Sequence, residues 1–241
     1  MAYVGTLAAG TVNATSTTGV LTVARAVPAG HTIVIGCAWE SAAQAVPHIE
    51  SVVDTRGNTY TVTPDASINA GATVSVALLR GRVSTPLQSG DTITITVSPG
   101  DARSRWAMVA EEHSGVADIP LDVISVNTGS GATMSTGVSP PTSQPDSLVV
   151  AVFGFGQGRS VTPPADWVAS PLVESSGPSA NRAVVMLHRY VTVAGAYEAT
   201  ATVSPSSTYA AALAAYRLAD TPSPAPTVAG AGWGWVPVGV P

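Results

Sequence analysis

Glu111, Glu112 and His113 form the densest group of titratable side chains in the sequence. Side chains alternate along a β-strand, so Glu111 and His113 are expected on one face and Glu112 on the other. A carboxylate and an imidazole on one face supply two ligands for a metal ion, and one more would have to come from elsewhere in the chain. The remaining histidines have no spacing that recommends them: His31, His48 and His188. A solvated end of a sheet is the better interpretation, and we expect no metal and no cofactor.

No other motif indicates catalysis. A serine nucleophile elbow requires Gly-x-Ser-x-Gly, which the sequence lacks. The glycine-rich residues 154–159 superficially resemble a phosphate-binding loop, but residues 160–164 contain two prolines and do not begin a helix. Asp54, Asp65 and Asp91 could hold calcium, but they do not form an Asp-x-Asp-x-Asp series. The two carboxylates of a glycosidase lie far apart in sequence, and nothing recommends a particular pair. We expect no catalytic residues and no enzyme activity.

Composition limits the classes of partner. The net charge is −5 and the isoelectric point is near 5.2, which argues against a nucleic-acid partner because such proteins carry a basic stripe. All ten basic residues are arginine, and codon bias explains this more simply than selection for carboxylate or phosphate contacts. Cys37 is the only cysteine, so no internal disulfide can form, and its apolar neighbours predict a buried, inert thiol.

The N-terminus does not resemble a secretory signal. Residues 1–16 lack a basic region and a continuous apolar region. No apolar run approaches the roughly 20 residues of a membrane-spanning helix. We therefore expect a protein made in the cytoplasm, without a signal peptide and without membrane insertion.

Residues 90–116 predict two strands and a turn more clearly than any other segment. Threonine alternates with isoleucine or valine over residues 92–97, which places apolar β-branched side chains on one face of a strand. Residues 98–101 supply a turn, and the second strand begins at Trp106. Residues 198–216 repeat the pattern of alternation, turn and apolar run.

Other segments extend this strand pattern. Residues 32–39 and 148–153 are nearly continuous apolar runs, as expected of strands that are buried on both faces. Residues 49–63 predict a β-hairpin whose turn is Asp54-Thr-Arg-Gly-Asn58. Further strands are expected at residues 19–27, 73–83, 123–126, 132–138, 167–174 and 181–193.

The two halves of the chain align in order. Leu148 pairs with Ile33 at an offset of 115, Leu187 with Leu79 at 108, Val203 with Val97 at 106 and Tyr209 with Trp106 at 103. The offset falls slowly, as it does when strands are kept and loops differ in length, which indicates an internal duplication. Two sheets that each take strands from both halves, or two small sandwiches that share a face, fit the pattern equally.

Together these features predict an all-β fold, a jelly-roll-like antiparallel β-sandwich built from two similar halves. Residues 1–116 form the first half, and residues 117–219 form the second half, packed with the first as one body. Residues 220–241 are rich in Pro, Gly and Trp and are expected to form an extended C-terminal tail. Large apolar groups at a chain end are explained if they dock on the body or on another subunit. The docking candidates are Trp233, Trp235, Val236 and Val238.

Four short motifs occur in an order that resembles a known family. They are VVDTRGNTY at residues 52–60, GDTITIT at 90–96, AEEHSGV with PLD at 110–122, and PDSLVV at 145–150. This series resembles the landmarks of a β-sandwich module in virion proteins of actinobacterial phages, often called minor tail proteins, and in related secreted bacterial proteins. The resemblance spans roughly residues 4–219. The resemblance implies a structural or adhesive role without catalysis. The family has no established catalytic residues that could be assigned to positions of this sequence.

We therefore expect a non-catalytic structural protein of a bacteriophage virion, either a minor tail protein or a head decoration protein. It would contact other virion proteins and form a homo-oligomer. The alternative is a carbohydrate-binding module that contacts a host-surface glycan through stacked aromatic rings. The candidates for stacking are Trp39, Tyr60 and Trp167.

Overall fold

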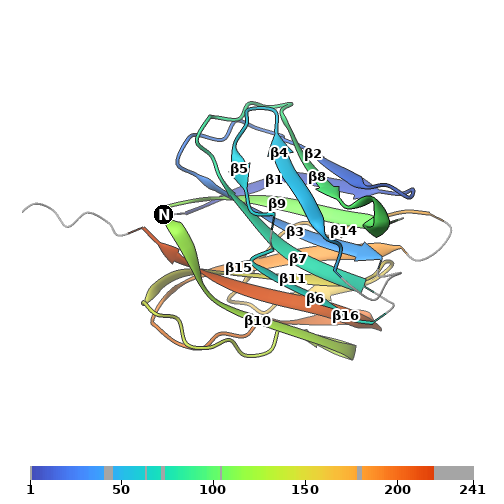
Figure 1. The fold of residues 1–241 in the computed structure, drawn as a ribbon. Coiled ribbons are helices and arrows are strands. Elements are labelled where there is room, and N and C mark those ends of the chain that lie inside the picture. Colours follow the sequence, from blue (N-terminus) through green and yellow to red (C-terminus); the bar gives the residue numbers. More distant parts are fainter. Residues whose placement is uncertain are drawn as a thin grey trace, which may run out of the picture.

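The computed structural model describes residues 2–40, 46–62, 64–71, 74–103, 105–177 and 181–219, and these residues form layered β-sheets (Figure 1). The strands are β1 (Ala2–Val12), β2 (Thr18–Thr22), β3 (Thr32–Glu40), β4 (Ile49–Asp54), β5 (Thr59–Tyr60), β6 (Ala66–Asn69), β7 (Val74–Arg82), β8 (Thr92–Val97), β9 (Trp106–Ser114), β10 (Val116–Ser135), β11 (Asp146–Gly156), β12 (Ser160–Thr162), β13 (Val168–Ala169), β14 (Val173–Glu174), β15 (Arg182–Thr192) and β16 (Thr200–Leu218). The described ranges contain no α-helix, and a 3₁₀ turn at Pro99–Asp101 follows β8. The pairings are antiparallel, so the predicted all-β antiparallel fold is confirmed.

The first half of the chain forms two sheets that pack face to face. The larger sheet has the strand order β1-β9-β3-β7-β5, with β6 also paired to β7, and the smaller sheet has the order β2-β8-β4. Alternation in β8 directs Ile93, Ile95 and Val97 into the first core between these sheets, where all three are fully buried. Cys37 lies in the same core as a free thiol, which confirms the prediction that it is buried, and burial raises its pKa.

The second half forms one large sheet and an outer layer that covers it. The large sheet has the order β10-β16-β11-β15-β13. The long strands β10 and β16 belong to both layers. In the outer layer, the first residues of β16 pair with residues 133–135 of β10 and with the short strand β12. In the large sheet, the later residues of β16 pair with β11. Phe153 and Phe155 of β11 are fully buried in the core between the sheet and this outer layer.

Strands of the two halves occupy equivalent places in their sheets. β3 and β11 lie at the centre, β7 and β15 lie on one side of them, and β9 and the second part of β16 lie on the other. Leu79 and Leu187 each face the core inside their own half. Ile33 also does so, but Leu148 faces the other half, which makes Val149 the positional equivalent of Ile33. Each sheet takes its strands from one half, so two small sandwiches share a face.

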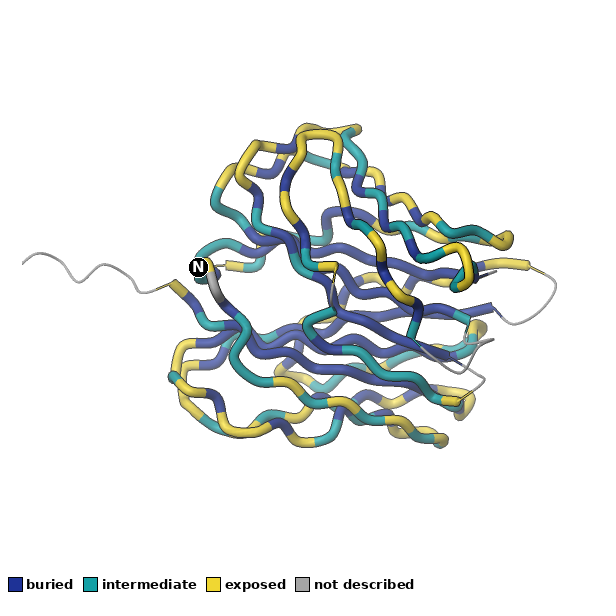
Figure 2. Tube along the Cα trace, in the orientation of Figure 1, coloured by how far each residue is buried: buried dark blue, intermediate teal, exposed yellow. Residues whose placement is uncertain are grey.

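The two large sheets pack back to back and bury a central core between the halves. β3 and β11 are buried along nearly their whole length, which explains their continuous apolar runs. Figure 2 shows these inner strands as buried and the outermost segments as largely exposed. A Cβ atom at Gly36 would lie 2.6 Å from Met186, and one at Gly154 would lie 2.4 Å from Val76. The close approach of the two sheets therefore requires glycine at both positions.

Some local predictions are wrong. Residues 49–63 do not form a hairpin, because β4 pairs with β8 in the small sheet whereas β5 pairs with β7 in the large sheet. The turn between them carries the chain from one layer to the next. The separate strands expected at residues 123–126 and 132–138 are also wrong, because β10 continues through the residues between them as it passes from the large sheet into the outer layer.

The expected C-terminal tail, with the docking candidates Trp233, Trp235, Val236 and Val238, lies outside the described residues. Within the described ranges, no helix has the length and hydropathy that crossing a membrane would require.

Candidate functional site

Glu111, Glu112 and His113 lie near the end of β9, and all three are fully buried. β9 is an interior strand between β1 and β3, and other layers cover both faces of its sheet. The prediction of a solvated sheet end is therefore wrong. The predicted alternation is confirmed, because Glu111 and His113 contact the second half of the chain whereas Glu112 contacts residues of the first half.

His188 on β15 brings a second imidazole to Glu111. Met186, His188 and Tyr190 follow one another on the face of β15 that packs against the first half, so the alternation of this strand places His188 opposite β9. Nδ1 of His188 lies 3.0 Å from Oε2 of Glu111, and Nε2 of His113 lies 3.4 Å from the same oxygen. One ligand atom from each of these three residues lies within 4.8 Å of the other two.

Two tyrosines enclose this group, which we call the Glu111 cluster: Glu111, His113 and His188. The hydroxyl of Tyr190 lies 3.1 Å from Nδ1 of His113. The ring of Tyr3 on β1 packs on His188, with 4.1 Å between the ring centroids. Both tyrosines are partly exposed, so they separate the cluster from solvent.

Burial and hydrogen bonding compete for the charge state of the cluster. Burial opposes ionisation of Glu111, but the contacts with His113 and His188 outweigh it and hold the pKa of this carboxyl below its usual value. Burial lowers the pKa of His113 in spite of the adjacent carboxylate. Burial raises the pKa of Tyr190, and the charge of Glu111 adds to that effect. The arrangement therefore favours an ionised Glu111 beside a neutral His113.

Glu112, on the opposite face of β9, has partners for both carboxylate oxygens. Arg25 forms an ion pair with one oxygen, and Nδ1 of His31 contacts the other. Arg25 also donates to the carbonyl oxygen of Gly5 at 3.1 Å. This group ties the segment between β2 and β3 to β9, and we interpret it as a structural ion pair.

The Glu111 cluster is less completely paired. Within the described part of the chain, Oε1 of Glu111 and Nε2 of His113 are buried without a hydrogen-bond partner. A buried polar atom left unpaired costs about 1–3 kcal/mol, and more when it carries charge. Two imidazole nitrogens and a carboxylate oxygen also form a ligand set that suits zinc. The cluster can therefore act as a buried hydrogen-bonded pair or as a metal site.

The equivalent position on the other side of the central core is filled with different residues. By the offsets of 108 and 103 between the halves, Arg80 on β7 corresponds to His188, and Tyr216 on β16 corresponds to His113. Nε of Arg80 lies 3.0 Å from Oδ2 of Asp65. Burial, and then the charge of Asp65, raise the pKa of Tyr216. Arg80 thus supplies the positive charge beside Asp65, whereas Glu111 itself corresponds, by the offset of 103, to the uncharged Ala214.

The aromatic residues expected to stack on sugars lie inside the protein. Trp39 is fully buried and meets Trp106 edge to face, with ring centroids 5.9 Å apart. Tyr60 is 6% exposed, and its hydroxyl lies 2.9 Å from a carboxylate oxygen of Asp54. Trp167 is 7% exposed and has a guanidinium group 5.4 Å from its ring centroid. This burial corrects the expectation, because none of the three presents a free ring face.

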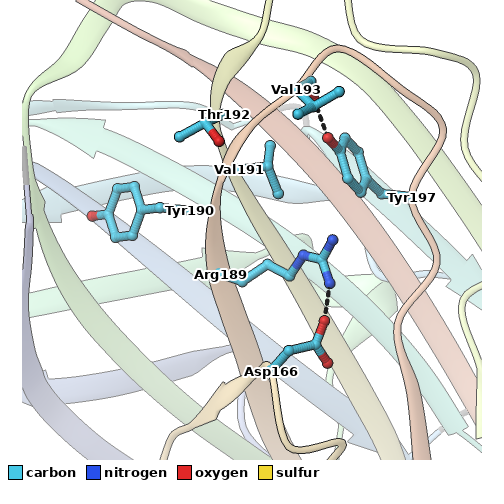
Figure 3. Close-up of a pocket in the computed structure, with 7 residues that line it drawn as sticks. All are labelled: Asp166, Arg189, Tyr190, Val191, Thr192, Val193 and Tyr197. Carbon is cyan, nitrogen blue, oxygen red and sulfur yellow. Dashed lines mark hydrogen bonds and ion pairs between the residues drawn. The ribbon is translucent and has the colours of Figure 1, made fainter.

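A surface pocket of about 300 Å³ lies beside the end of β15 (Figure 3). Arg189 forms an ion pair with Asp166 there, and its guanidinium carbon lies 5.2 Å from the ring centroid of Tyr197. The hydroxyl of Tyr197 donates to the carbonyl oxygen of Val193. Figure 3 shows Tyr190 pointing away from this group. The polar side chains of the pocket thus contact one another, and they assign no ligand to it.

The motif at residues 52–60 has a structural role. Oδ1 of Asp54 accepts a hydrogen bond from the backbone N–H of Asn58 at 3.0 Å. Oδ1 of Asn58 in turn accepts from the backbone N–H groups of Ser84 and Thr85, at 2.8 and 2.7 Å. The network fixes the crossing between β4 and β5 to the loop that follows β7.

The calcium candidates are used in internal contacts as well. Asp65 pairs with Arg80 at 3.0 Å, and Asp91 pairs with Arg56 at 2.7 Å. Asp54 belongs to the network with Asn58.

Sequence reasoning missed His188, because 77 residues separate it from Glu111 and their proximity depends on how the sheets stack. The available signal was alternation in β15, where His188 and Tyr190 continue the buried face of Val184 and Met186 with polar groups. The chain matches no protein-family model, no curated protein and no solved structure.

Proposed function

We propose that this chain is a non-catalytic structural protein of a bacteriophage virion, either a minor tail protein or a head decoration protein, that acts through protein–protein contacts in a homo-oligomeric assembly. The ordered motifs that resemble virion β-sandwich proteins support the proposal. Residues 52–60 and 90–96 hold the layers of the first half together, and residues 110–122 include the end of the interior strand β9. Motifs that stabilise the fold, and do not form a reactive site, are consistent with a protein that acts through contacts at its surface.

The observation that carries the proposal is the edge formed by β10. β10 is the last strand of its sheet and pairs there with β16. Residues 123–145 contain no charged side chain. Ile124, Val126 and Val138 in this stretch are 43%, 39% and 63% exposed. Proteins that remain monomeric protect edge strands with charge, proline or a covering segment, so the uncharged part of this edge, residues 123–135, suits pairing with another chain.

Immunogold labelling tests the virion assignment. Particles from a culture that produces the phage are labelled with an antibody against this chain and viewed in negative stain. We expect gold at one site on the particle, and its position on the tail or the head chooses between the two roles. Unlabelled particles in a culture whose lysate contains the chain would contradict the proposal.

A pair of lysine substitutions tests the edge. Val126→Lys places a charge on β10, and Val53→Lys is the matched control, because Val53 is a strand residue that is 52% exposed in a different layer. We expect Val126→Lys to lower incorporation into particles by about tenfold, equivalent to roughly 1.4 kcal/mol of binding, while Val53→Lys incorporates normally. Equal incorporation of both variants would show that the β10 edge is not the contact.

A further inference from the structure

We propose that Glu111, His113 and His188 bind a divalent transition-metal ion, for which zinc is the best fit, and that this ion joins the two halves of the fold. Glu111 and His113 come from β9 in the first half, and His188 comes from β15 in the second. The inference does not depend on a virion role, because it concerns how the sheets are held together.

The spacing of the three side chains suits tetrahedral coordination. Zinc binds imidazole nitrogen and carboxylate oxygen at about 2.0–2.2 Å, so two ligand atoms of a tetrahedral site lie about 3.3–3.5 Å apart. Oε2 of Glu111 lies 3.4 Å from Nε2 of His113 and 3.0 Å from Nδ1 of His188. The ligand atoms of all three residues lie within 4.8 Å of one another, so a small movement of one ring completes the site.

Two buried atoms of the cluster have no hydrogen-bond partner among the residues that the structure describes. They are Oε1 of Glu111 and Nε2 of His113, and both residues are fully buried. Nε2 of His113 lies 3.4 Å from the other carboxylate oxygen, Oε2, which Nδ1 of His188 also approaches. A metal ion held by Nε2 of His113 and by the Glu111 carboxylate would give both groups a partner.

The neighbours of His113 orient it for this role. Histidine ligands commonly use their second ring nitrogen in a hydrogen bond that sets the tautomer. Nδ1 of His113 lies 3.1 Å from the hydroxyl of Tyr190. A tautomer that donates from Nδ1 to this hydroxyl leaves the lone pair of Nε2 directed at Glu111.

A second carboxylate beside the central core has an arginine as its partner, because Arg80 lies 3.0 Å from Asp65. Glu111 contacts two histidines instead, and Arg25 is paired with Glu112 on the other face of β9. A divalent ion would supply Glu111 with the positive charge that Arg80 supplies to Asp65.

A structural ion is a better assignment than a catalytic one. Three protein ligands leave one position of tetrahedral zinc for water, but all three residues are fully buried and the pocket in Figure 3 is lined by other residues. Tyr3 covers His188 and is partly exposed, so displacement of this ring opens a route for the ion.

Metal analysis of the full chain tests the proposal. The protein is stripped with EDTA, incubated with ZnCl₂, desalted and analysed for zinc by mass spectrometry. We expect one zinc per wild-type chain. Glu111→Gln and His188→Gln should each lower the zinc affinity by about 100-fold or more. This loss exceeds the 10–100-fold that is typical when a hydrogen-bond partner of a metal ligand is removed. His48→Ala is the matched control, because His48 is exposed and distant from the cluster in sequence, and it should keep the zinc.

A second measurement uses only the wild-type chain, so its result does not depend on whether the variants fold. Cobalt in place of zinc should give the intense visible absorption of a four-coordinate site with nitrogen and oxygen ligands. Less than about one tenth of an equivalent of zinc in the wild-type chain, or a weak six-coordinate cobalt spectrum, would overturn the proposal. Zinc retained in folded Glu111→Gln, or lost in His48→Ala, would reveal an adventitious ion and overturn it equally.

Discussion

Nδ1 of His188 and Oε2 of Glu111 lie 3.0 Å apart, and this buried contact joins β15 of the second half to β9 of the first. The contact lies at one side of the central core, which consists mainly of apolar side chains. Its energy depends on both partners, because a buried charge is tolerated only when it is paired. The stability of the interface between the halves should therefore respond sharply to the removal of either residue.

His188→Leu should destabilise the metal-free protein by about 3–5 kcal/mol, because it leaves the Glu111 carboxylate buried with one partner fewer. Urea unfolding in EDTA measures the change. His48→Leu, at an exposed position, should change stability by about 0.5 kcal/mol or less. The double variant Glu111→Leu with His188→Leu should recover part of the loss, since it removes both partners. A cost below about 1 kcal/mol for His188→Leu would show that the pair contributes little.

Asn58→Ala should cost about 2–3 kcal/mol, because the backbone N–H groups of Ser84 and Thr85 lose their acceptor. Asn58 is 4% exposed, so water does not readily replace it. The comparison is Asn127→Ala in β10, where the side chain accepts a hydrogen bond from the adjacent backbone N–H at 2.9 Å. Thermal and urea unfolding should separate the two variants clearly. Equal, small effects would mean that the layer crossing does not need this network.

Gly154→Ala should destabilise the protein by about 1–3 kcal/mol through overpacking between the large sheets. The added Cβ would lie 2.4 Å from Val76 and 3.0 Å from the Cβ of Ala38, and neither neighbour has a long flexible side chain that can move away. Gly100→Ala serves as the control, since a Cβ there meets no atom within 4 Å. Urea midpoints of the two variants give the comparison, and a neutral Gly154→Ala would show that the sheets can separate at little cost.

Acid should weaken the contact between Asp91 and Arg56. The hydrogen bond from Arg56, and then that from the backbone N–H of Gln88, lower the pKa of Asp91 to about 2. In the unfolded chain this pKa is about 3.9. A depressed pKa in the folded state stabilises the protein fully above about pH 4 and loses that contribution as the pH falls towards 2.

The Asp91→Asn variant isolates this effect. Its urea midpoint should fall less than that of the wild type between pH 6 and pH 2.5, because the amide does not titrate. Glu174→Gln, a carboxylate variant at another exposed strand end, should keep the wild-type pH dependence. Parallel curves for wild type and Asp91→Asn would remove Asp91 from the acid response.

Local sequence patterns were enough to predict many of the strands and their buried faces. The alternation at residues 92–97, the apolar runs of β3 and β11 and the long strand β15 all follow from side-chain periodicity, which is a property of neighbouring residues. The opposite directions of Glu111 and Glu112 follow from the same rule.

Only the stacking of the sheets decided what these faces meet. A turn at residues 54–58 can join two paired strands or two layers, and its chemistry is the same in both cases, which is why the predicted hairpin was wrong. His188 meets Glu111 across 77 residues because two sheets pack back to back, and Gly36 and Gly154 permit their close approach. Such contacts depend on the relative position of whole layers, so no local pattern of residues encodes them.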